Sequence, residues 1–229
     1  MQQPWVETTE RFTRREAGVI FDMDGVLVDS QTAHLESWKQ LAAEIGRTVT
    51  EEQFRATFGR TSRDIIVSLF GPRHSDADLR RLDERKEFLY RELIRGRVPA
   101  MPGAIELVRS IHAAGLRIAA GSSGPAENVR LVMDELGLHA WVSACVTGQN
   151  VTRGKPDPQV FVLAAQRLGL SPRRCVVVED APVGIEAGRR AGCRTIGLCG
   201  THGRDGLTAA DAVVERLSQI TAEMLEGLL

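Results

Sequence analysis

Five short apolar runs, each closed by a cluster of polar residues, constrain the fold of this 229-residue chain more than any other feature. They lie at Gly18–Phe21, Leu116–Ala120, Val142–Val146, Cys175–Val178 and Thr195–Leu198. The segments between them carry apolar residues at steps of three and four, which indicates helices at Ala104–Ala114, Ala126–Leu136, Pro158–Leu168 and Val183–Ala191. Apolar runs that alternate with helices are typical of strands buried on both faces of a parallel sheet. We therefore predict an α/β fold with a doubly wound parallel sheet, followed by an edge strand at Ala212–Val214 and a helix at Leu217–Leu228.

One long segment interrupts this alternation. Between the first run and Pro102 the chain has helical periodicity and no buried-strand run, with expected helices at Thr32–Ile45, Glu51–Phe58, Ser62–Phe70 and Asp76–Leu93. Thr50 and Ser75 each precede acidic residues, which is a signal for a helix start. So long a structured segment is not a connecting loop. We predict an all-helical domain inserted after the first strand, with a flexible N-terminal extension at 1–16, a core at 17–30 and 100–229, and the insertion at 31–99.

The charge balance and the hydropathy pattern exclude several classes of partner. The chain carries 29 Lys and Arg against 30 Asp and Glu, a formal charge of −1, so it lacks the basic excess of a nucleic-acid-binding protein. No run of about 18 apolar residues occurs, and the N-terminus has no apolar stretch of the signal-peptide kind. We expect a cytoplasmic protein with no nucleic-acid or membrane partner, and either a monomer or a dimer.

Paired carboxylates follow two of the predicted strands. Asp22 and Asp24, with Gly25 to turn the chain, come after the first run, and Glu179 and Asp180 come after the fourth. Ligands in an open α/β sheet bind outside the carboxyl ends of the strands. Acidic groups that meet there need a cation or a shared proton, and Mg²⁺ binds through one or two carboxylates. The ordinary alternatives are an acidic surface turn and acids that favour a helix N-terminus.

Two other strand ends carry groups suited to an anion. Ser122 and Ser123 lie between the second run and a helix, where hydroxyls and free N–H groups can bind phosphate. Lys155 stands between Gly154 and Pro156, which restrict the backbone and could direct its charge to an anion. Taken separately, each signal has an ordinary interpretation: the serines as helix-capping turn residues and the lysine as a solvated loop residue. Four such signals at four strand ends are jointly much stronger than any one.

The joint pattern resembles the haloacid dehalogenase superfamily of phosphotransferases. The segment Phe21–Ser30 looks like its first motif, Ser122 its second, Lys155 its third and the pair Glu179–Asp180 its fourth. Order and strand-end placement match as well, and the resemblance covers essentially the whole chain from Gly18 onward. The helical insertion is similar to the cap of the subfamily that contains β-phosphoglucomutase and phosphoglycolate-type phosphatases. The resemblance implies a Rossmann-like core with an inserted helical cap.

The resemblance also implies chemical roles for these residues. Asp22 would be the nucleophile that accepts the phosphoryl group as an aspartyl phosphate. Asp24 would protonate the leaving alcohol and then activate water, while its backbone carbonyl helps to hold Mg²⁺. Asp22 and Asp180 would be metal ligands, with Glu179 a ligand or the partner of one. Phosphate binding would fall to four residues, namely Ser122, Ser123, Lys155 and Gly25.

The cap would select the substrate, a small phosphorylated metabolite. His34 occupies a position similar to a histidine of β-phosphoglucomutase, and Arg60 and Arg63 could contact a substrate anion. Phe58 and Ser62 stand where the mutases have Lys and Arg, which disfavours mutase activity. For all three cap residues, packing or solvated surface positions are equally good interpretations.

We therefore expect a Mg²⁺-dependent phosphatase that acts on a sugar phosphate or phosphoglycolate. A β-phosphoglucomutase-like sugar phosphomutase is the first alternative. A catalytically silent binding protein on the same fold is the second, and it would have lost part of this set of motifs. A nucleotide-sugar transferase with an Asp-x-Asp metal site is the third, and it would not explain Lys155 or the acidic pair after Val178.

Overall fold

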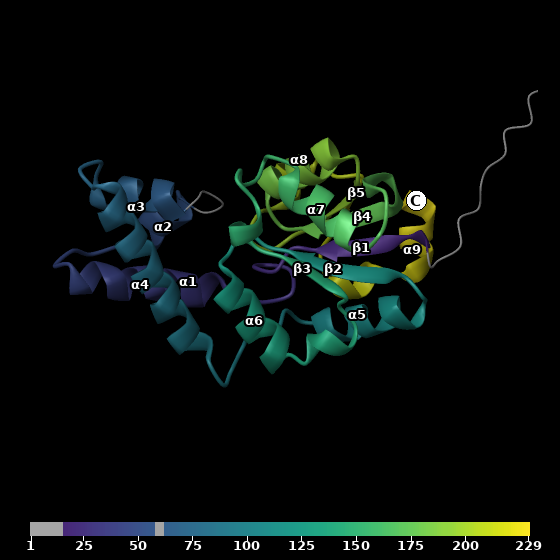
Figure 1. Cartoon of the computed structure of the whole chain (residues 1–229), viewed down its shortest axis with the longest axis horizontal. Helices are drawn as coiled ribbons and strands as arrows, with labels where there is room; N and C mark the ends of the chain where they lie inside the picture. Colours follow the sequence, from purple (N-terminus) through teal and green to yellow (C-terminus); the bar gives the residue numbers. More distant parts are fainter. Residues whose placement is uncertain (1–15, 58–61) are drawn as a thin grey trace, which may run out of the picture.

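The computed structural model describes residues 16–57 and 62–229 and contains a six-stranded parallel sheet, ordered β3-β2-β1-β4-β5-β6 (Figure 1). The strands are β1 (Gly18–Phe21), β2 (Arg117–Gly121), β3 (Ala144–Val146), β4 (Cys175–Glu179), β5 (Arg194–Leu198) and β6 (Ala212–Val214). The first strand of the chain, β1, lies in the middle of the sheet. Strands β2 and β3 follow on one side of it and β4, β5 and β6 on the other. This is the Rossmann-like, doubly wound architecture expected from the apolar runs, and that prediction is confirmed.

Helices cover both faces of the sheet. Val19 and Phe21 of β1 are buried in one apolar cluster, which also contains apolar residues of α5 (Ala104–Ala113), α6 (Ala126–Glu135) and α9 (Ala222–Leu228). Ile20 points to the opposite face and packs with α7 (Gln159–Arg167) and α8 (Pro182–Ala191). The alternation of side chains along a strand explains why one apolar run supplies both layers.

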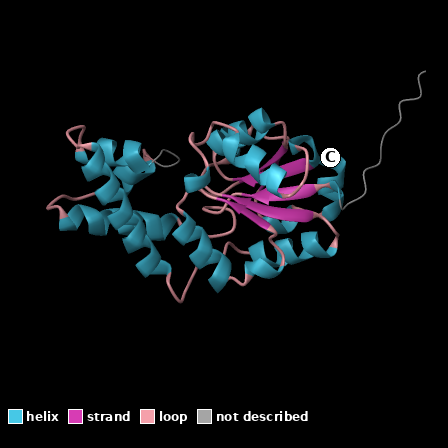
Figure 2. Cartoon of the chain, in the orientation of Figure 1, coloured by secondary structure: helices cyan, strands magenta, loops and turns pink. Residues whose placement is uncertain are grey.

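A separate helical unit follows β1 and consists of α1 (Gln31–Glu44), α2 (Glu51–Arg55), α3 (Ser62–Phe70) and α4 (Asp76–Ile94). It lies beside the sheet and contains no strand in its described residues (Figure 2). Thr50 and Ser75 cap α2 and α4, each accepting a bond from the N–H three residues on, as the start signals predicted. The unit has its own apolar cluster, built around Trp38, Phe54 and Ile66.

The predicted helix at Leu217–Leu228 is wrong in one respect, because the structure divides it. A short 3₁₀ turn at Leu217–Gln219 precedes α9, and Ile220 between them is extended. The Thr221 hydroxyl accepts a hydrogen bond from the N–H of Met224 at 3.1 Å and so starts a new helix. Elsewhere the predicted elements occur with shifted ends, and α2 stops at Arg55, short of the predicted end.

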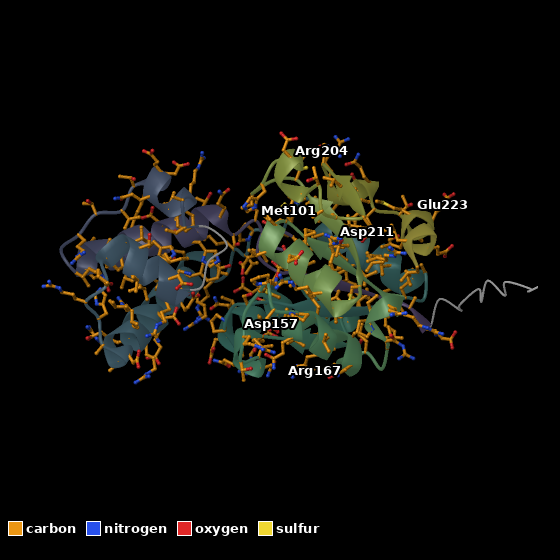
Figure 3. The ribbon with its side chains drawn as sticks, turned by 90° about the horizontal axis from the view of Figure 1, so that it is seen from above. Met101, Asp157, Arg167, Arg204, Asp211 and Glu223 are labelled. Atoms are coloured by element: carbon orange, nitrogen blue, oxygen red, sulfur yellow. The ribbon has the colours of Figure 1, made fainter. Side chains whose placement is uncertain are left out.

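Charged side chains occupy the outside of the core. Arg167, Arg204 and Glu223 are exposed at the surface in the view from above (Figure 3). In the described ranges, no helix combines the length and the apolar character required to cross a bilayer.

The separate core of the helical unit yields the first testable prediction. Ile66→Ala removes a side chain with no exposed surface and should lower the free energy of unfolding by about 2–5 kcal/mol. Amide hydrogen exchange should accelerate in α1–α4 more than in the sheet strands, because the lost contacts lie within the unit. Ile45→Ala, at a residue 36% exposed, is the control and should change stability by less than about 0.5 kcal/mol. Equal acceleration in the sheet would contradict a separate core.

Candidate active site

A cavity of about 880 Å³ lies at the carboxyl ends of the central strands, between the sheet and the helical unit. The core contributes seven predicted site residues to its wall, namely Asp22, Asp24, Ser122, Ser123, Lys155, Glu179 and Asp180. The helical unit contributes both apolar and charged side chains, with Trp38, Phe54 and Ile65 among the former. The cavity therefore combines the core motifs with a wall supplied by a different part of the chain.

Lys155 connects two carboxylates at the base of the cavity. Its Nζ lies 2.7 Å from Oδ1 of Asp22 and 2.6 Å from Oε1 of Glu179. The Lys155 side chain is 8% exposed, and those of Asp22 and Glu179 are 11% and 1% exposed. Three charges that are far apart in the sequence thus form a buried ion-paired cluster.

The sheet register brings these carboxylates together. Phe21 of β1 pairs with Val178 of β4, so Asp22 and Glu179 leave adjacent strands at the same level. The Asp22 N–H donates to the Val178 carbonyl at 2.9 Å. The Glu179 carboxylate folds back over the turn and accepts, through Oε2, the N–H groups of Asp180 and Ala181, both at 2.9 Å.

Two glycines make room for these acidic side chains. A Cβ at Gly184, in the first turn of α8, would overlap the carboxylate of Glu179. A Cβ at Gly25 would overlap Oδ2 of Asp180, and its φ of +78° favours glycine as well. The Gly25 N–H donates to the Val28 carbonyl at 2.8 Å, so it is already engaged within the turn. The phosphate contact expected of Gly25 stays a prediction and has no free N–H to support it.

Asp22, Glu179 and Asp180 fit a divalent cation. One carboxylate oxygen from each lies within 4.8 Å of the others, and all three residues are buried. Oδ2 of Asp180 is buried and has no hydrogen-bond partner among the described residues. An orphaned carboxylate oxygen is costly to bury, and a hard cation with oxygen ligands removes that cost. This donor set can hold a cation such as Mg²⁺, whereas the carboxylate of Asp24 is not part of it.

Burial and like charges shift the protonation of this cluster. Burial raises the pKa of Asp22 to about 7, with Glu179 and Asp24 adding to the effect and Lys155 opposing it. Burial, and then the charges of Glu179 and Asp22, raise the pKa of Asp180 well above its ordinary value. Burial acts to lower the pKa of Lys155, but the carboxylates of Asp22 and Glu179 outweigh it and raise that pKa. Lys155 is therefore a permanent positive charge at the base of the cavity.

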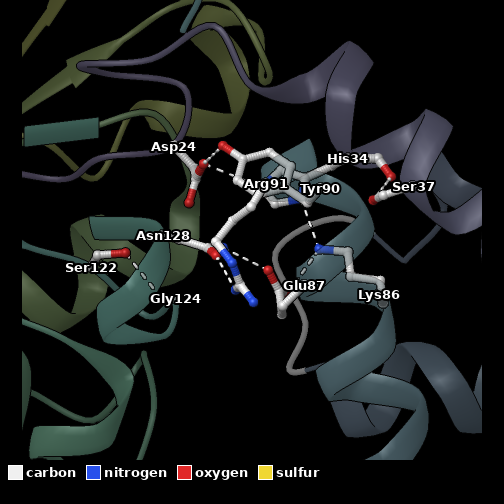
Figure 4. Close-up of polar contacts among 10 residues, drawn as sticks. All are labelled: Asp24, His34, Ser37, Lys86, Glu87, Tyr90, Arg91, Ser122, Gly124 and Asn128. Carbon is white, nitrogen blue, oxygen red and sulfur yellow. Dashed lines mark hydrogen bonds and ion pairs between the residues drawn. The ribbon is translucent and has the colours of Figure 1, made fainter. Parts of the chain in front are cut away.

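Asp24 faces the helical unit. Its Oδ1 lies 3.2 Å from Nε2 of His34 and accepts a hydrogen bond from the Tyr90 hydroxyl at 3.4 Å (Figure 4). The His34 and Tyr90 rings stack, with centroids 4.1 Å apart and planes 6° apart. Burial acts to raise the pKa of Asp24, but its interactions with His34, above all, hold that pKa well below the ordinary range.

Sequence reasoning missed the polar residues of α4 that complete this side of the site. Nζ of Lys86 lies 2.8 Å from Nδ1 of His34 and 2.8 Å from Oε1 of Glu87. Oε2 of Glu87 accepts a hydrogen bond from Asn128 of α6 at 2.6 Å, and Asn128 in turn accepts one from Arg91 at 2.8 Å (Figure 4). No sequence signal separated Lys86 and Glu87 from the other charged residues of Asp76–Ile94. Only the fold buries them.

The two predicted serines follow β2 at the cavity wall. Ser122 is buried, its N–H donates to Val146 at 2.9 Å, and its Oγ accepts a hydrogen bond from Gly124 at 3.0 Å. Ser123 is exposed and lines the cavity. The turn that leads into α6 thus holds the Ser122 hydroxyl, while Ser123 lies at the exposed part of the wall.

The predicted cap residues have different outcomes. His34 lines the cavity, but both ring nitrogens already lie within hydrogen-bonding distance of protein groups. Arg63 also lines it, is exposed, and pairs with Asp76 at 2.7 Å. Arg60, like Phe58, lies outside the described residues. Substrate contact by these residues stays a prediction.

Comparisons with known proteins agree with this geometry. A family profile described as haloacid dehalogenase-like hydrolase matches residues 17–192. Hexitol phosphatase A of Escherichia coli (strain K12) is 37% identical over 206 residues, which cover 89% of this chain and 93% of that protein. Beta-phosphoglucomutase of Bacillus subtilis (strain 168) is 31% identical over 214 residues, 90% of this chain and 92% of that protein. The crystal structure of a HAD hydrolase, family IA, variant 3, from Entamoeba histolytica HM-1:IMSS superimposes with a TM-score of 0.85 and 26% identity, over 93% of this chain and 98% of that one.

The space that Gly184 leaves for Glu179 generates a prediction about cation binding. Gly184→Ala should displace the Glu179 carboxylate and weaken Mg²⁺ binding, measured by calorimetry, by about tenfold or more. Gly203→Ala is the control, because that residue has an ordinary φ of −73° and open space around it. Unchanged Mg²⁺ affinity in the Gly184 variant would show that the position of Glu179 does not matter for a cation.

Proposed function

Because this chain belongs to the haloacid dehalogenase-like hydrolases, we propose that it is a Mg²⁺-dependent phosphatase of small phosphorylated sugars, working through an aspartyl phosphate. It is an enzyme of the phosphatase class, as the names of its relatives indicate. One observation carries the proposal: Asp22 lies at the base of a large cavity, fixed by Lys155 and beside a buried cluster of acids that fits a cation.

Asp22 is the nucleophile in this proposal. Lys155 binds its Oδ1 and orients the carboxylate, which attacks phosphorus while the bond from phosphorus to the alcohol oxygen breaks. Lys155 and the Ser122 turn offset charge on the transferring phosphoryl oxygens, as phosphoryl transfer requires. Asp22 and Asp180, with the Asp24 backbone carbonyl and with Glu179 as ligand or partner, would hold Mg²⁺, which supplies further positive charge to those oxygens.

Asp24 is the acid and base of the reaction. It gives a proton to the leaving alcohol in the first step and takes one from the attacking water in the second. Its low pKa makes it a carboxylate in the free enzyme, which suits the second step. The negative charge of a bound phosphate ester raises the pKa of a neighbouring carboxyl, which favours the protonated form needed in the first step.

The shape and polarity of the cavity support a hydroxylated substrate. Its volume of about 880 Å³ accommodates a small metabolite, and polar side chains of the helical unit line the wall that faces the core. Asp83 of α4 is one of them, and its Oδ1 is buried with no hydrogen-bond partner in the part of the chain that the structure describes. A substrate hydroxyl is a suitable donor to this oxygen, and relatives named for a hexitol and for glucose agree with a sugar. In this proposal residues 31–99 act as the cap that selects the substrate.

The charges of the helical unit favour hydrolysis over mutase activity. A mutase must hold a second phosphate with cations of its cap. Within the described part of the chain, the unit brings three cations to the cavity wall, and each already has an acceptor: Arg63 has Asp76, Lys86 has Glu87 and Arg91 has Asn128. Three acids, Asp83, Glu84 and Glu87, share the same wall and oppose a second dianion. Sugar phosphomutase activity is the second candidate function, because one relative is named beta-phosphoglucomutase.

Loss of the nucleophile tests the proposal. Asp22→Asn should lower phosphate release by at least about a thousandfold, because an amide cannot form the covalent intermediate. The panel should contain glucose 6-phosphate, fructose 1-phosphate, sorbitol 6-phosphate, phosphoglycolate and β-glucose 1-phosphate, with glucose 6-phosphate formation followed for the last. Asp29→Asn, at an exposed carboxylate of the same segment, is the matched control and should retain activity. Equal turnover by the Asp22 variant would refute the mechanism, and isomerisation faster than phosphate release would favour the mutase.

Removal of the cation provides a second test. Phosphate release should fall to background when a chelator removes divalent ions and should return when Mg²⁺ is added, because the acidic cluster otherwise repels the phosphate. Full activity in the chelator, with the ion content checked by elemental analysis, would contradict Mg²⁺ dependence.

A further inference from the structure

A continuous chain of polar contacts leaves the core, passes through the helical unit and returns to the core (Figure 4). It starts at Asp24 after β1 and reaches His34 on α1. It continues through Lys86 and Glu87 on α4 and ends at Asn128 on α6. Each contact spans 2.6 to 3.2 Å. The helical unit therefore contacts the core at two points of this network, through His34 at Asp24 and through Glu87 at Asn128.

The middle of this chain is buried and charged. Lys86, Glu87 and Asn128 are 3%, 8% and 6% exposed. Glu87 uses both carboxylate oxygens, Oε1 for Lys86 and Oε2 for Asn128. Buried charges of this kind depend on every partner, because the loss of one leaves another without compensation.

The direction of the hydrogen bonds follows from their donors. A lysine ammonium has only donors, so Nδ1 of His34 must accept from Lys86. A ring proton then lies on Nε2, which donates to Oδ1 of Asp24. Tyr90 donates to the same oxygen, and neither donor engages Oδ2. The position of Lys86 thus determines the tautomer of His34, and His34 and Tyr90 together orient the Asp24 carboxylate.

We propose that Glu87 and Asn128 form a polar latch between the helical unit and the core, and that the latch positions Lys86 and His34 so that Asp24 can protonate the leaving alcohol. This inference rests on the proposed function. Without Asn128, the free oxygen of Glu87 turns to Lys86 or Arg91 and draws Lys86 away from His34. Asp24 then loses the His34 hydrogen bond and keeps only that of Tyr90, so its carboxylate is less firmly oriented for proton transfer. Glu87 and Asn128 are positioning residues in this account.

The leaving group provides the test. A sugar alcohol needs a proton as it leaves, whereas p-nitrophenolate leaves without one, so only the sugar phosphate depends on Asp24 in the first step. The measured quantity is kcat/KM, which reports the first phosphoryl transfer, for p-nitrophenyl phosphate and for the fastest sugar phosphate of the panel. Asn128→Ala should lower kcat/KM about tenfold for the sugar phosphate and less than about twofold for the aryl ester.

An exchange of the two side chains distinguishes the latch from a general defect. In Glu87→Gln/Asn128→Asp the amide and the carboxylate trade places, so a hydrogen bond still joins α4 to α6 and Arg91 keeps an acceptor. The double variant should recover sugar phosphate hydrolysis to within about threefold of wild type. Glu135→Ala is the matched control, because Glu135 of α6 binds the N–H groups of Gly96 and Val98 without contact to Lys86. It should change both substrates by the same factor.

The possible results separate the inference from the proposed function. Equal losses on both esters in Asn128→Ala, no loss on either, or no recovery in the exchanged variant would each overturn the latch while phosphatase activity stands. A wild-type enzyme that releases no phosphate from any sugar phosphate of the panel would contradict the proposed function and, with it, the latch.

Discussion

The ion-paired contact of Lys155 with Asp22 and Glu179 is the interaction on which the rest of the site depends. Carboxylates that leave adjacent parallel strands at the same level repel each other, and here a third acid, Asp180, lies within the same cluster. One buried ammonium at 2.6 to 2.7 Å from two of them offsets part of that repulsion. Oδ2 of Asp180 has no partner among the described residues, so Lys155 does not compensate all of the negative charge. The uncompensated charge makes the cluster suitable for a cation.

The helical unit complements the core with a different kind of chemistry. The core holds the charges that meet the phosphoryl group, on rigid strand ends whose register sets their spacing. The unit has its own apolar cluster and reaches the site through the partly buried His34 of α1 and buried polar side chains of α4. The residues that meet the phosphoryl group therefore belong to the core. The helical unit contributes to proton transfer, because His34 and Tyr90 contact Asp24.

Much of this arrangement could be predicted from local patterns. Asp22, Asp24, Ser122, Lys155, Glu179 and Asp180 all follow apolar runs, and the carboxyl ends of parallel strands meet at one edge, so their juxtaposition follows from the fold class. Lys86, Glu87 and Asn128 lie within amphipathic helices rich in charge, where spacing does not distinguish a buried ion pair from a solvated one. Likewise, Ile220 and Thr221 carry no strong breaker signal, and only packing and the Thr221 cap divided the last predicted helix.

The sequence by itself determined the doubly wound sheet, the helical insertion after its first strand and the identity of the acids and the lysine at the strand ends. These follow from hydrophobic periodicity and chain order, which are local properties. The tertiary structure alone decided which oxygens Lys155 bridges, that Gly184 must leave room for Glu179, and that the partners of Asp24 come from the helical unit. The physical reason is that burial and the distance between partners depend on residues far apart in the chain, such as His34 and Lys86, whose sequence numbers differ by 52.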